Sequence, residues 1–322
     1  MTKDDGRAPE KLLLLDTASL YFRAFYGMPD TITRADGTPV NAVRGLLDMI
    51  ARLVTEFEAT ELIACWDDDW RPAWRVDLVP SYKEHRVARR GSKGAADVET
   101  VPDGLTAQIP MIREVLELAG IAIVGAPGYE ADDVIGSYTA QARKGLPVDV
   151  VTGDRDLFQV VDDDQPVRVV YTARGMKNLE VLTAATVVAK YRVLPEQYAD
   201  YATLRGDTSD GLPGVGGIGE KTAASLLGEY GTLDGLLRAA ADEEGGVSAG
   251  IRLKLERAAD YLAVAPRVVA VARDLDLPKP EDTGARLAPI SGEARAELER
   301  LSAEENLGGA VGRLLKAFDR FA

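Results

Sequence analysis

Short apolar runs alternate with amphipathic stretches along the first half of the chain. Runs typical of buried strands occupy residues 12–16, 61–67, 121–124, 148–151 and 167–171. Apolar residues at helical spacing predict helices at about 18–27, 40–58 and 105–119, and a further helix from Glu130. Strands that alternate with helices predict an α/β fold, with a mostly parallel sheet and helices on both faces.

The pattern changes near residue 184. Strand signals end there, and alanine, leucine and arginine dominate, which predicts a helical domain over residues 184–322. The α/β unit then covers residues 11–183, and the polar residues 1–10 are expected to be a disordered lead. A long connection, at about 70–103, follows the second strand. Long connections between elements are usually functional or disordered.

Composition narrows the class of protein. Acidic residues outnumber basic ones by 52 to 38, so general adhesion to polyanions is not the default expectation. One cysteine, Cys65, and one histidine, His85, exclude a disulfide framework and a cysteine- or histidine-rich metal site. No apolar stretch is long enough for a membrane span, and the start of the chain does not have the form of a secretory signal. These features predict a cytoplasmic protein.

Aspartates stand where predicted strands end. Asp16 closes the first strand, Asp67 the second, and Asp154 follows the strand at 148–151. Ligands bind beyond the carboxyl ends of parallel strands, so these acids are expected to converge. The motifs GYEADDVIG, TGDRDLF and GDTSDGLPG add six more acids: Glu130, Asp132, Asp133, Asp156, Asp207 and Asp210.

Nine converging carboxylates cannot all stay ionised without cations, because like charges a few ångströms apart repel. A ligand set of oxygens, without imidazole or thiolate, selects Mg²⁺ or Mn²⁺. A structural role is the alternative for single members, since acids often cap helices and Asp16 alone fits an ordinary turn. Together the acids predict a divalent metal site.

Residues 71–93 form a basic segment within this acidic protein. Seven basic residues stand against Asp77 and Glu84 and give the segment a net charge of +5: Arg71, Arg75, Lys83, Arg86, Arg89, Arg90 and Lys93. We expect the segment to be mobile in the free protein and to be ordered by a bound single strand.

A glycine-rich stretch covers residues 211–227. Gly214, Gly216 and Gly219 have the dinucleotide-binding spacing, but no strand precedes them, and Glu220 shifts Lys221 out of the P-loop register. The stretch instead predicts a tight turn that opens a helix at 220–228. Free backbone N–H groups and Lys221 would hold a phosphate there. A packing turn without a ligand is the alternative.

These motifs occur in the order of a known family. The segments LLLLDTASLYFRAF, ACWDDDW, PSYKEHR, GYEADDVIG, TGDRDLFQVV and LRGDTSDGLPGVGGIGEKTAASLL resemble the 5′-nuclease (flap endonuclease) superfamily. They are most similar to the 5′–3′ exonuclease domain of bacterial DNA polymerase I, here in a free-standing form. The resemblance implies a PIN-like nuclease core with a basic arch, followed by a helical DNA-binding domain with a helix–three-turn–helix element.

The resemblance also implies roles for individual residues. It places a first metal ion at Asp16, Asp67, Glu130 and Asp132, with Asp133 beside them, and a second at Asp154, Asp156, Asp207 and Asp210. The cofactors implied are two Mg²⁺ ions, with Mn²⁺ as a substitute. Asp68 and Asp69 adjoin Asp67, so which of these three is the ligand stays open.

DNA contacts are implied in the same way. Lys83 and Arg86 match basic residues of the family's arch that act on the scissile phosphate. Tyr82 matches a residue that stacks on a nucleobase, and Arg23 matches an arginine that contacts a phosphate. An ordinary loop aromatic is the alternative for Tyr82. Gly214, Gly216, Gly219 and Lys221 match the element that grips duplex backbone, with a K⁺ ion.

The function implied is a metal-dependent 5′–3′ exonuclease and 5′-flap endonuclease that leaves 5′-phosphate and 3′-hydroxyl ends, in primer removal or DNA repair. A monomer near the nucleoid, working alongside a DNA polymerase, is expected. The alternatives are a non-catalytic junction-binding protein, which would lack the second set of acids, and a metal-dependent phosphatase. LDTAS lacks the second aspartate of a phosphatase D-x-D motif, which disfavours the latter.

Overall fold

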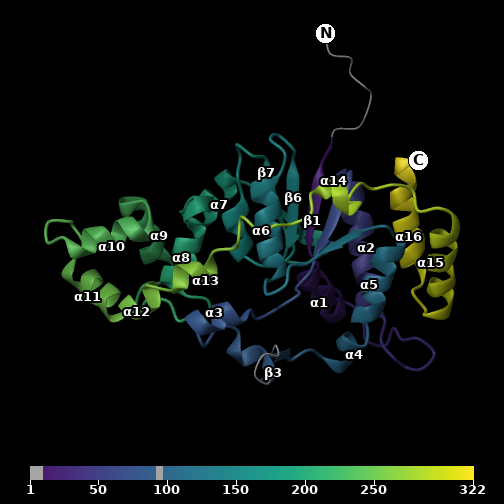
Figure 1. The fold of residues 1–322 in the computed structure, drawn as a ribbon, viewed down its shortest axis with the longest axis horizontal. Helices are drawn as coiled ribbons and strands as arrows, with labels where there is room; N and C mark the ends of the chain where they lie inside the picture. The colour runs from purple at the N-terminus through teal and green to yellow at the C-terminus, as the bar shows by residue number, and fades with distance from the viewer. Residues whose placement is uncertain (1–9, 92–96) are drawn as a thin grey trace, which may run out of the picture.

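A six-stranded sheet forms the centre of the protein (Figure 1). The computed structural model describes residues 10–91 and 97–322, so nearly all of the predicted lead at 1–10 lies outside the described residues. The strand order is β5-β2-β1-β6-β7-β8, and only β7 and β8 pair antiparallel. The strands are β1 (Leu12–Asp16), β2 (Glu61–Cys65), β5 (Ala122–Val124), β6 (Val148–Thr152), β7 (Val167–Tyr171) and β8 (Glu180–Leu182).

The central strand β1 explains the leucine run of the sequence. Its neighbours are β2 and β6, and all five of its residues are buried. Leu12 and Leu14 pack into the core on one face of the sheet, and Leu13 and Leu15 into the core on the other. A parallel strand covered on both faces has no solvent side, so its sequence reads as continuous apolar residues.

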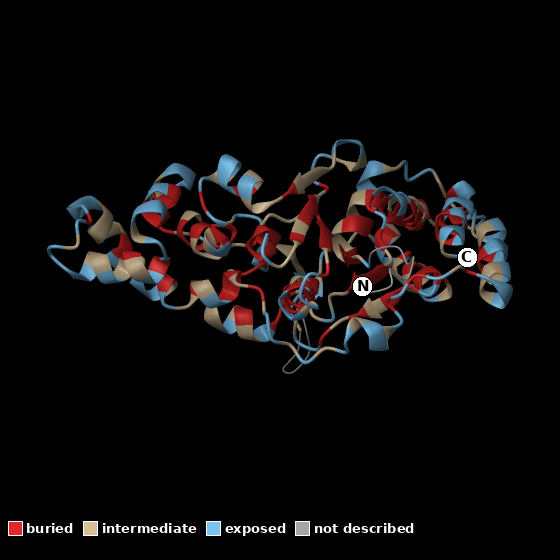
Figure 2. Ribbon diagram, turned by 90° about the horizontal axis from the view of Figure 1, so that it is seen from above, coloured by how far each residue is buried: buried red, intermediate tan, exposed pale blue. Residues whose placement is uncertain are grey.

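Helices cover both faces, as predicted. One core contains residues of α1 (Thr17–Gly27), α2 (Asn41–Glu56) and α5 (Ile109–Leu118), and the other contains residues of α6 (Ala131–Gln141), α7 (Ala184–Tyr191), α8 (Tyr198–Arg205) and α9 (Glu220–Tyr230). Buried residues gather on the sheet and on the inner sides of these helices (Figure 2). None of the helices in the described chain combines the length and apolar character that crossing a membrane requires.

The predicted elements are confirmed, with additions. The sequence did not indicate β8, the hairpin strands β3 (Val87–Arg89) and β4 (Val98–Glu99), or the short helices α3 (Ala73–Leu78) and α4 (Asp103–Thr106). The region after β8 contains α10 (Leu233–Ala241), α11 (Ala249–Arg257), α12 (Ala259–Leu262), α13 (Ala265–Val269), α14 (Pro280–Thr283), α15 (Gly292–Glu304) and α16 (Gly309–Phe318).

The last two helices differ from the prediction of one helical domain over residues 184–322. Helices α9 to α12 form one end of the molecule, whereas α15 and α16 lie at the other end (Figure 1). Val311 and Leu314 of α16 share the core of α2 residues Leu46 and Ile50. The apolar face of α16 covers the outer face of α2, so residues 292–318 belong with the sheet.

Candidate active site

The carboxyl edge of the sheet carries a cavity of about 870 Å³. Five of the predicted acids line it: Asp16, Asp67, Glu130, Asp132 and Asp154. Strand ends and the start of α6 bring these side chains together from distant parts of the sequence, as predicted. Asp68 packs against Gly125, and Asp69 accepts a hydrogen bond from the backbone of Arg71, so Asp67 is the member of its triplet that faces the cavity.

Burial and mutual repulsion make the first set of carboxyls hard to ionise. Burial, with the charges of Asp67 and Asp154, raises the pKa of Asp16 to about 7 even though Thr152 and the Ser19 backbone donate to it at 2.6 and 3.1 Å. Burial and the charges of Asp16 and Asp154 raise the pKa of Asp132 well above its usual range. A cation bound between these carboxyl groups would relieve both their burial cost and their repulsion.

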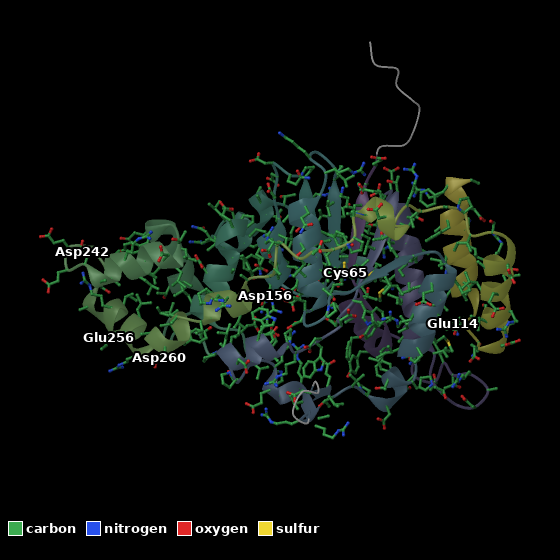
Figure 3. The ribbon with its side chains drawn as sticks, viewed as in Figure 1. Cys65, Glu114, Asp156, Asp242, Glu256 and Asp260 are labelled. Carbon is green, nitrogen blue, oxygen red and sulfur yellow. The ribbon has the colours of Figure 1, made fainter. Side chains whose placement is uncertain are left out.

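The second set continues from Asp154 away from the cavity. Burial and the charges of Asp154 and Asp210 raise the pKa of Asp156, and its buried Oδ1 has no hydrogen-bond partner in the described chain. Burial also raises the pKa of Asp210, although the positive charge of Lys83 acts to lower it. Asp207 is the exception: despite burial, hydrogen bonds from Ser209 and the charge of Arg205 lower its pKa. In Figure 3, Asp156 and the buried core residue Cys65 are labelled.

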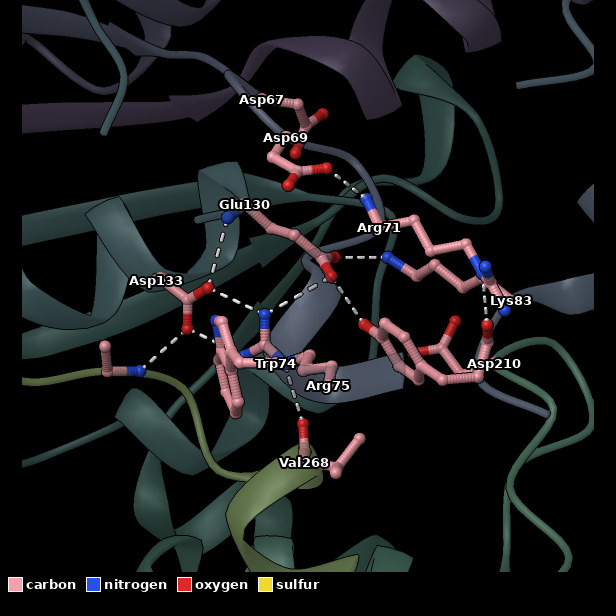
Figure 4. A network of polar contacts seen from close by, with 12 residues as sticks. Asp67, Asp69, Arg71, Trp74, Arg75, Lys83, Glu130, Asp133, Asp210 and Val268 are labelled. Atoms are coloured by element: carbon pink, nitrogen blue, oxygen red, sulfur yellow. Dashed lines mark hydrogen bonds and ion pairs between the residues drawn. The ribbon is translucent and has the colours of Figure 1, made fainter. Parts of the chain in front are cut away.

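Glu130 is held by three side chains of the basic segment (Figure 4). The Tyr82 hydroxyl donates to its Oε1 at 2.7 Å, the Arg75 guanidinium lies 3.2 Å from the same oxygen, and Lys83 forms an ion pair with Oε2. In the described chain, no three carboxylates form a ready-made ligand set for one ion. Both oxygens of Glu130 are engaged by donors of the protein itself.

Arg75 and Asp133 form a buried ion pair beside this site. Two guanidinium nitrogens lie 2.7 Å from the two carboxylate oxygens, and the side chains are 3% and 0% exposed. Arg75 also donates to the carbonyl of Val268, at 3.0 Å, and Asp133 accepts from the Ala272 backbone at 2.9 Å. The pair therefore ties α3, the start of α6 and the chain after α13 to one another.

The basic segment also packs against the GDTSDG motif. Ser81 donates from its hydroxyl to the Gly211 carbonyl at 2.7 Å, and the Lys83 backbone donates to Asp210 at 2.9 Å. Gly211 has φ +69°, and a Cβ there would lie 2.0 Å from the Ser81 carbonyl oxygen. Only glycine permits this approach, which brings Lys83 and Arg86 close to both sets of acids.

The glycine stretch forms the predicted turn and opens a helix at residue 220. Gly214 has φ +66°, and a Cβ there would collide with the backbone of Gly206 at 2.5 Å. A Cβ at Gly216 or Gly219 would meet nothing within 4 Å. Gly219 is the N-cap residue of α9, so no side chain caps the first backbone N–H groups of this helix, and Lys221 is exposed in its first turn. A packing turn therefore explains the glycine at 214, whereas the backbone at Gly216 and Gly219 is accessible to a ligand.

Comparison with known proteins gives the family. The model of the 5′-3′ exonuclease N-terminal resolvase-like domain matches residues 11–192, and that of the 5′-3′ exonuclease C-terminal SAM fold matches residues 193–291. A 5′-3′ exonuclease of Streptomyces coelicolor is 55% identical, over 94% of this chain and 98% of that protein. The chain belongs to the 5′-3′ exonuclease family.

Two further relatives extend this result. DNA polymerase I of Mycobacterium bovis is 41% identical over 72% of this chain, which corresponds to 24% of the polymerase. The crystal structure of the T5 D15 protein co-crystallized with metal ions has a TM-score of 0.62, covers 97% of this chain and 99% of that chain, and is 16% identical. At that identity the likeness shows the fold: a PIN-like nuclease core with a helical SAM-fold domain.

Two predicted site residues have contacts that the sequence did not indicate. The ring of Tyr82 is 4% exposed and its hydroxyl donates to Glu130, so stacking on a nucleobase would require the ring to leave this position. Arg75 engages both oxygens of Asp133, so metal binding by Asp133 would require this ion pair to open, and both roles stay predictions.

The basic segment is not a free patch of positive charge. Five of its bases are ion-paired with acids, namely Arg71, Arg75, Lys83, Arg86 and Arg90. Lys93 lies outside the described residues. Arg90 pairs within the segment, with Glu84, whereas the partners of the other four lie 26 to 124 residues along the chain, too far to be recognised from spacing.

Two cavity residues were missed. Arg174 and Lys177 follow the strand β7 and line the cavity. The strand-end rule that selected the aspartates applies equally to these bases, so the signal was present in TARGMKN.

Proposed function

We propose that the protein is a divalent-metal-dependent 5′–3′ exonuclease and 5′-flap endonuclease that hydrolyses DNA phosphodiesters to 5′-phosphate and 3′-hydroxyl ends. The observation that carries this proposal is the cavity in which acids from three strand ends and from α6 meet the bases Lys83 and Arg86. Carboxylates suit hard metal ions, and the bases suit a phosphate, so the two groups of side chains complement a metal-bound polyanion.

The donor set fits a divalent ion. The acids offer only oxygens, their pKa values are raised by burial and mutual repulsion, and one buried oxygen of Asp156 is unpartnered. Asp16, Asp67, Glu130 and Asp132 would hold one ion, and Asp154, Asp156, Asp207 and Asp210 a second. Two Mg²⁺ ions, or Mn²⁺ in their place, would neutralise phosphate charge and activate water.

The chain's own bases would stabilise the charge that develops on the phosphoryl oxygens. The Lys83 ammonium lies at the Glu130 carboxylate inside the cavity, and Arg86 reaches Asp210 at 3.2 Å. If Glu130 served as a metal ligand, Lys83 would leave its ion pair with Glu130 and could donate to a phosphoryl oxygen. Prepositioned donors of this kind act in the transition state without reorganisation. Tyr82, which donates to the same carboxylate, would orient Glu130 during this exchange.

The direct test is cleavage of a 5′-labelled flap DNA followed by gel electrophoresis. We expect cleavage with Mg²⁺ or Mn²⁺, no cleavage with excess chelator, and binding without turnover in Ca²⁺, which accepts looser oxygen geometry. Full activity in excess chelator would contradict the metal proposal. Binding without cleavage under all metal conditions would favour a junction-binding protein, and release of inorganic phosphate alone would favour a phosphatase.

The C-terminal domain would hold the duplex through its glycine turn. Lys221 and the open backbone at Gly216 and Gly219 would contact phosphates, with K⁺ at the same element as the resemblance implies. Replacing Lys221 with alanine is expected to weaken duplex binding in all sequences and to reduce the salt slope by about 0.9. Binding titrations at several salt concentrations measure this, with Lys279→Ala as an exposed control. An unchanged slope would favour a packing turn.

The setting of the activity follows from the same proposal. We expect a monomer near the nucleoid that removes primers or repair flaps beside a DNA polymerase. The similarity to one quarter of DNA polymerase I supports this pairing, because that protein carries both parts in one chain.

A further inference from the structure

The cations that line the cavity differ in what they contact. Lys83 and Arg86 are ion-paired with Glu130 and Asp210. Arg23, Arg174 and Lys177 line the same cavity, and no carboxylate of the described chain lies within ion-pair distance of them. These three cationic side chains are therefore the ones in the cavity lining that remain available to an anionic ligand.

Arg23 is placed between the sheet edge and the β7–β8 loop. It comes from α1, and one terminal nitrogen donates to the Ala173 carbonyl at 3.4 Å. Its Nε is buried and has no hydrogen-bond partner among the residues that the structure describes. Burial lowers its pKa. A guanidinium with one orphaned donor at the wall of a cavity is poised for an anionic acceptor.

The β7–β8 loop, residues 172–179, is a built structure. The Thr172 backbone donates to Thr152 at 2.8 Å, which fixes the start of the loop beside the end of β6. Gly175, at φ +85°, donates to the Thr172 carbonyl at 2.7 Å, and the Asn178 side chain donates to the Arg174 carbonyl at 3.3 Å. The loop thus presents Arg174 and Lys177, both exposed, from a defined turn.

We propose that Arg174 and Lys177, with Arg23, form a second phosphate-binding wall that holds phosphodiesters of the DNA strand being cleaved. The inference rests on the proposed nuclease function. Lys83 and Arg86 belong to the segment after β2, whereas Arg174 and Lys177 follow β7. Asp16, at the end of β1, and Asp154, after β6, therefore lie between these two groups of cationic residues. A strand that crosses the acids is then held on both sides of the scissile bond.

The placement of the wall favours the cleaved strand over its complement. Arg23, Arg174 and Lys177 line the same cavity as Asp16 and Asp154, which would act on the scissile phosphate. Phe22, Met49 and Met176 line the cavity with them, and they offer apolar surface to sugars and bases. Phosphate contacts position a strand without reading its sequence, so the wall would act on any DNA.

The test compares Arg174→Ala/Lys177→Ala with Lys144→Ala/Lys316→Ala. The control pair removes the same charge from exposed lysines that have no ion pair in the described chain and do not line the cavity. Binding of fluorescent flap DNA is titrated in Ca²⁺ between 50 and 200 mM salt. The loop variant is expected to lose two phosphate contacts, which lowers the slope of log affinity against log salt concentration by about 1.8. Over this salt range the affinity of the wild type should therefore fall about tenfold more than the affinity of the loop variant. The control should keep the wild-type slope.

Single phosphates of either DNA strand can be replaced by neutral methylphosphonates to identify those that Arg174 and Lys177 contact. A substitution near the scissile bond of the cleaved strand should weaken binding by wild type and leave binding by the loop variant unchanged, since the contact is already lost. The proposal would be overturned if only methylphosphonates in the complementary strand distinguished the wild type from the loop variant. It would also be overturned if the loop and control variants had the same salt slope. Wild type that binds but never cleaves would refute the nuclease function, whereas the slopes would still decide whether the wall exists.

Discussion

Replacing Asp154 with alanine is expected to lower flap cleavage by roughly a thousandfold or more, and to leave the dissociation constant for the same DNA unchanged or lower. Asp154 lines the cavity, and its charge raises the pKa of Asp16 and Asp132 on one side and of Asp156 on the other. Losing a ligand of the second ion would remove several kcal/mol of transition-state stabilisation, and each 1.36 kcal/mol is about tenfold in rate. Binding moves the other way, because one carboxylate fewer repels the phosphates.

Single-turnover rates and dissociation constants on one flap substrate separate these effects. Asp164→Ala is the matched control, since it removes the same charge from an exposed residue that does not line the cavity. Asp210→Ala should behave like Asp154→Ala. If either variant at the site cleaves at the rate of the control, the assignment of these acids to metal binding is wrong.

The fold could be predicted where a segment's own sequence determines its environment. The run at 12–16 is buried on both faces and became β1 with the predicted bounds, as residues 167–171 became β7. The short β8 and the β3–β4 hairpin depend on partners supplied by other segments, so their sequences carry little signal. Helix α16 falls in the region predicted to be helical, residues 184–322, but nothing in its sequence indicates that it packs on α2.

The candidate site shows the same division. The rule that strand ends meet at one edge placed Asp16, Asp67 and Asp154 correctly around the cavity. The roles of side chains in the basic segment could not be derived, because Tyr82 and Glu130 are 48 residues apart and the hydrogen bond between them depends on the folded path of both segments. A count of charges also cannot distinguish a basic side chain that forms an ion pair within the protein from one that is free to bind a ligand.

Replacing Arg75 with methionine is expected to lower the free energy of unfolding by about 3–5 kcal/mol, because it leaves the fully buried Asp133 carboxylate without its partner. The loss should include the link to Val268, so α13 separates more readily from α3. Urea unfolding of the whole chain measures the change. Arg89→Met is the control, since Arg89 is exposed and has no ion pair in the described chain.

The double variant Arg75→Met/Asp133→Asn tests the cause of that loss. Removing both charges should recover part of the stability, because the cost of a broken buried pair lies mainly in the charge that remains. Stability alone does not describe the role of Arg75, since the same guanidinium lies 3.2 Å from Glu130. If Arg75 also orients Glu130, the double variant should still cleave flap DNA more slowly than wild type at saturating Mg²⁺ and at temperatures where both are folded. An Arg75→Met variant as stable as Arg89→Met would mean that the pair does not hold these three segments together.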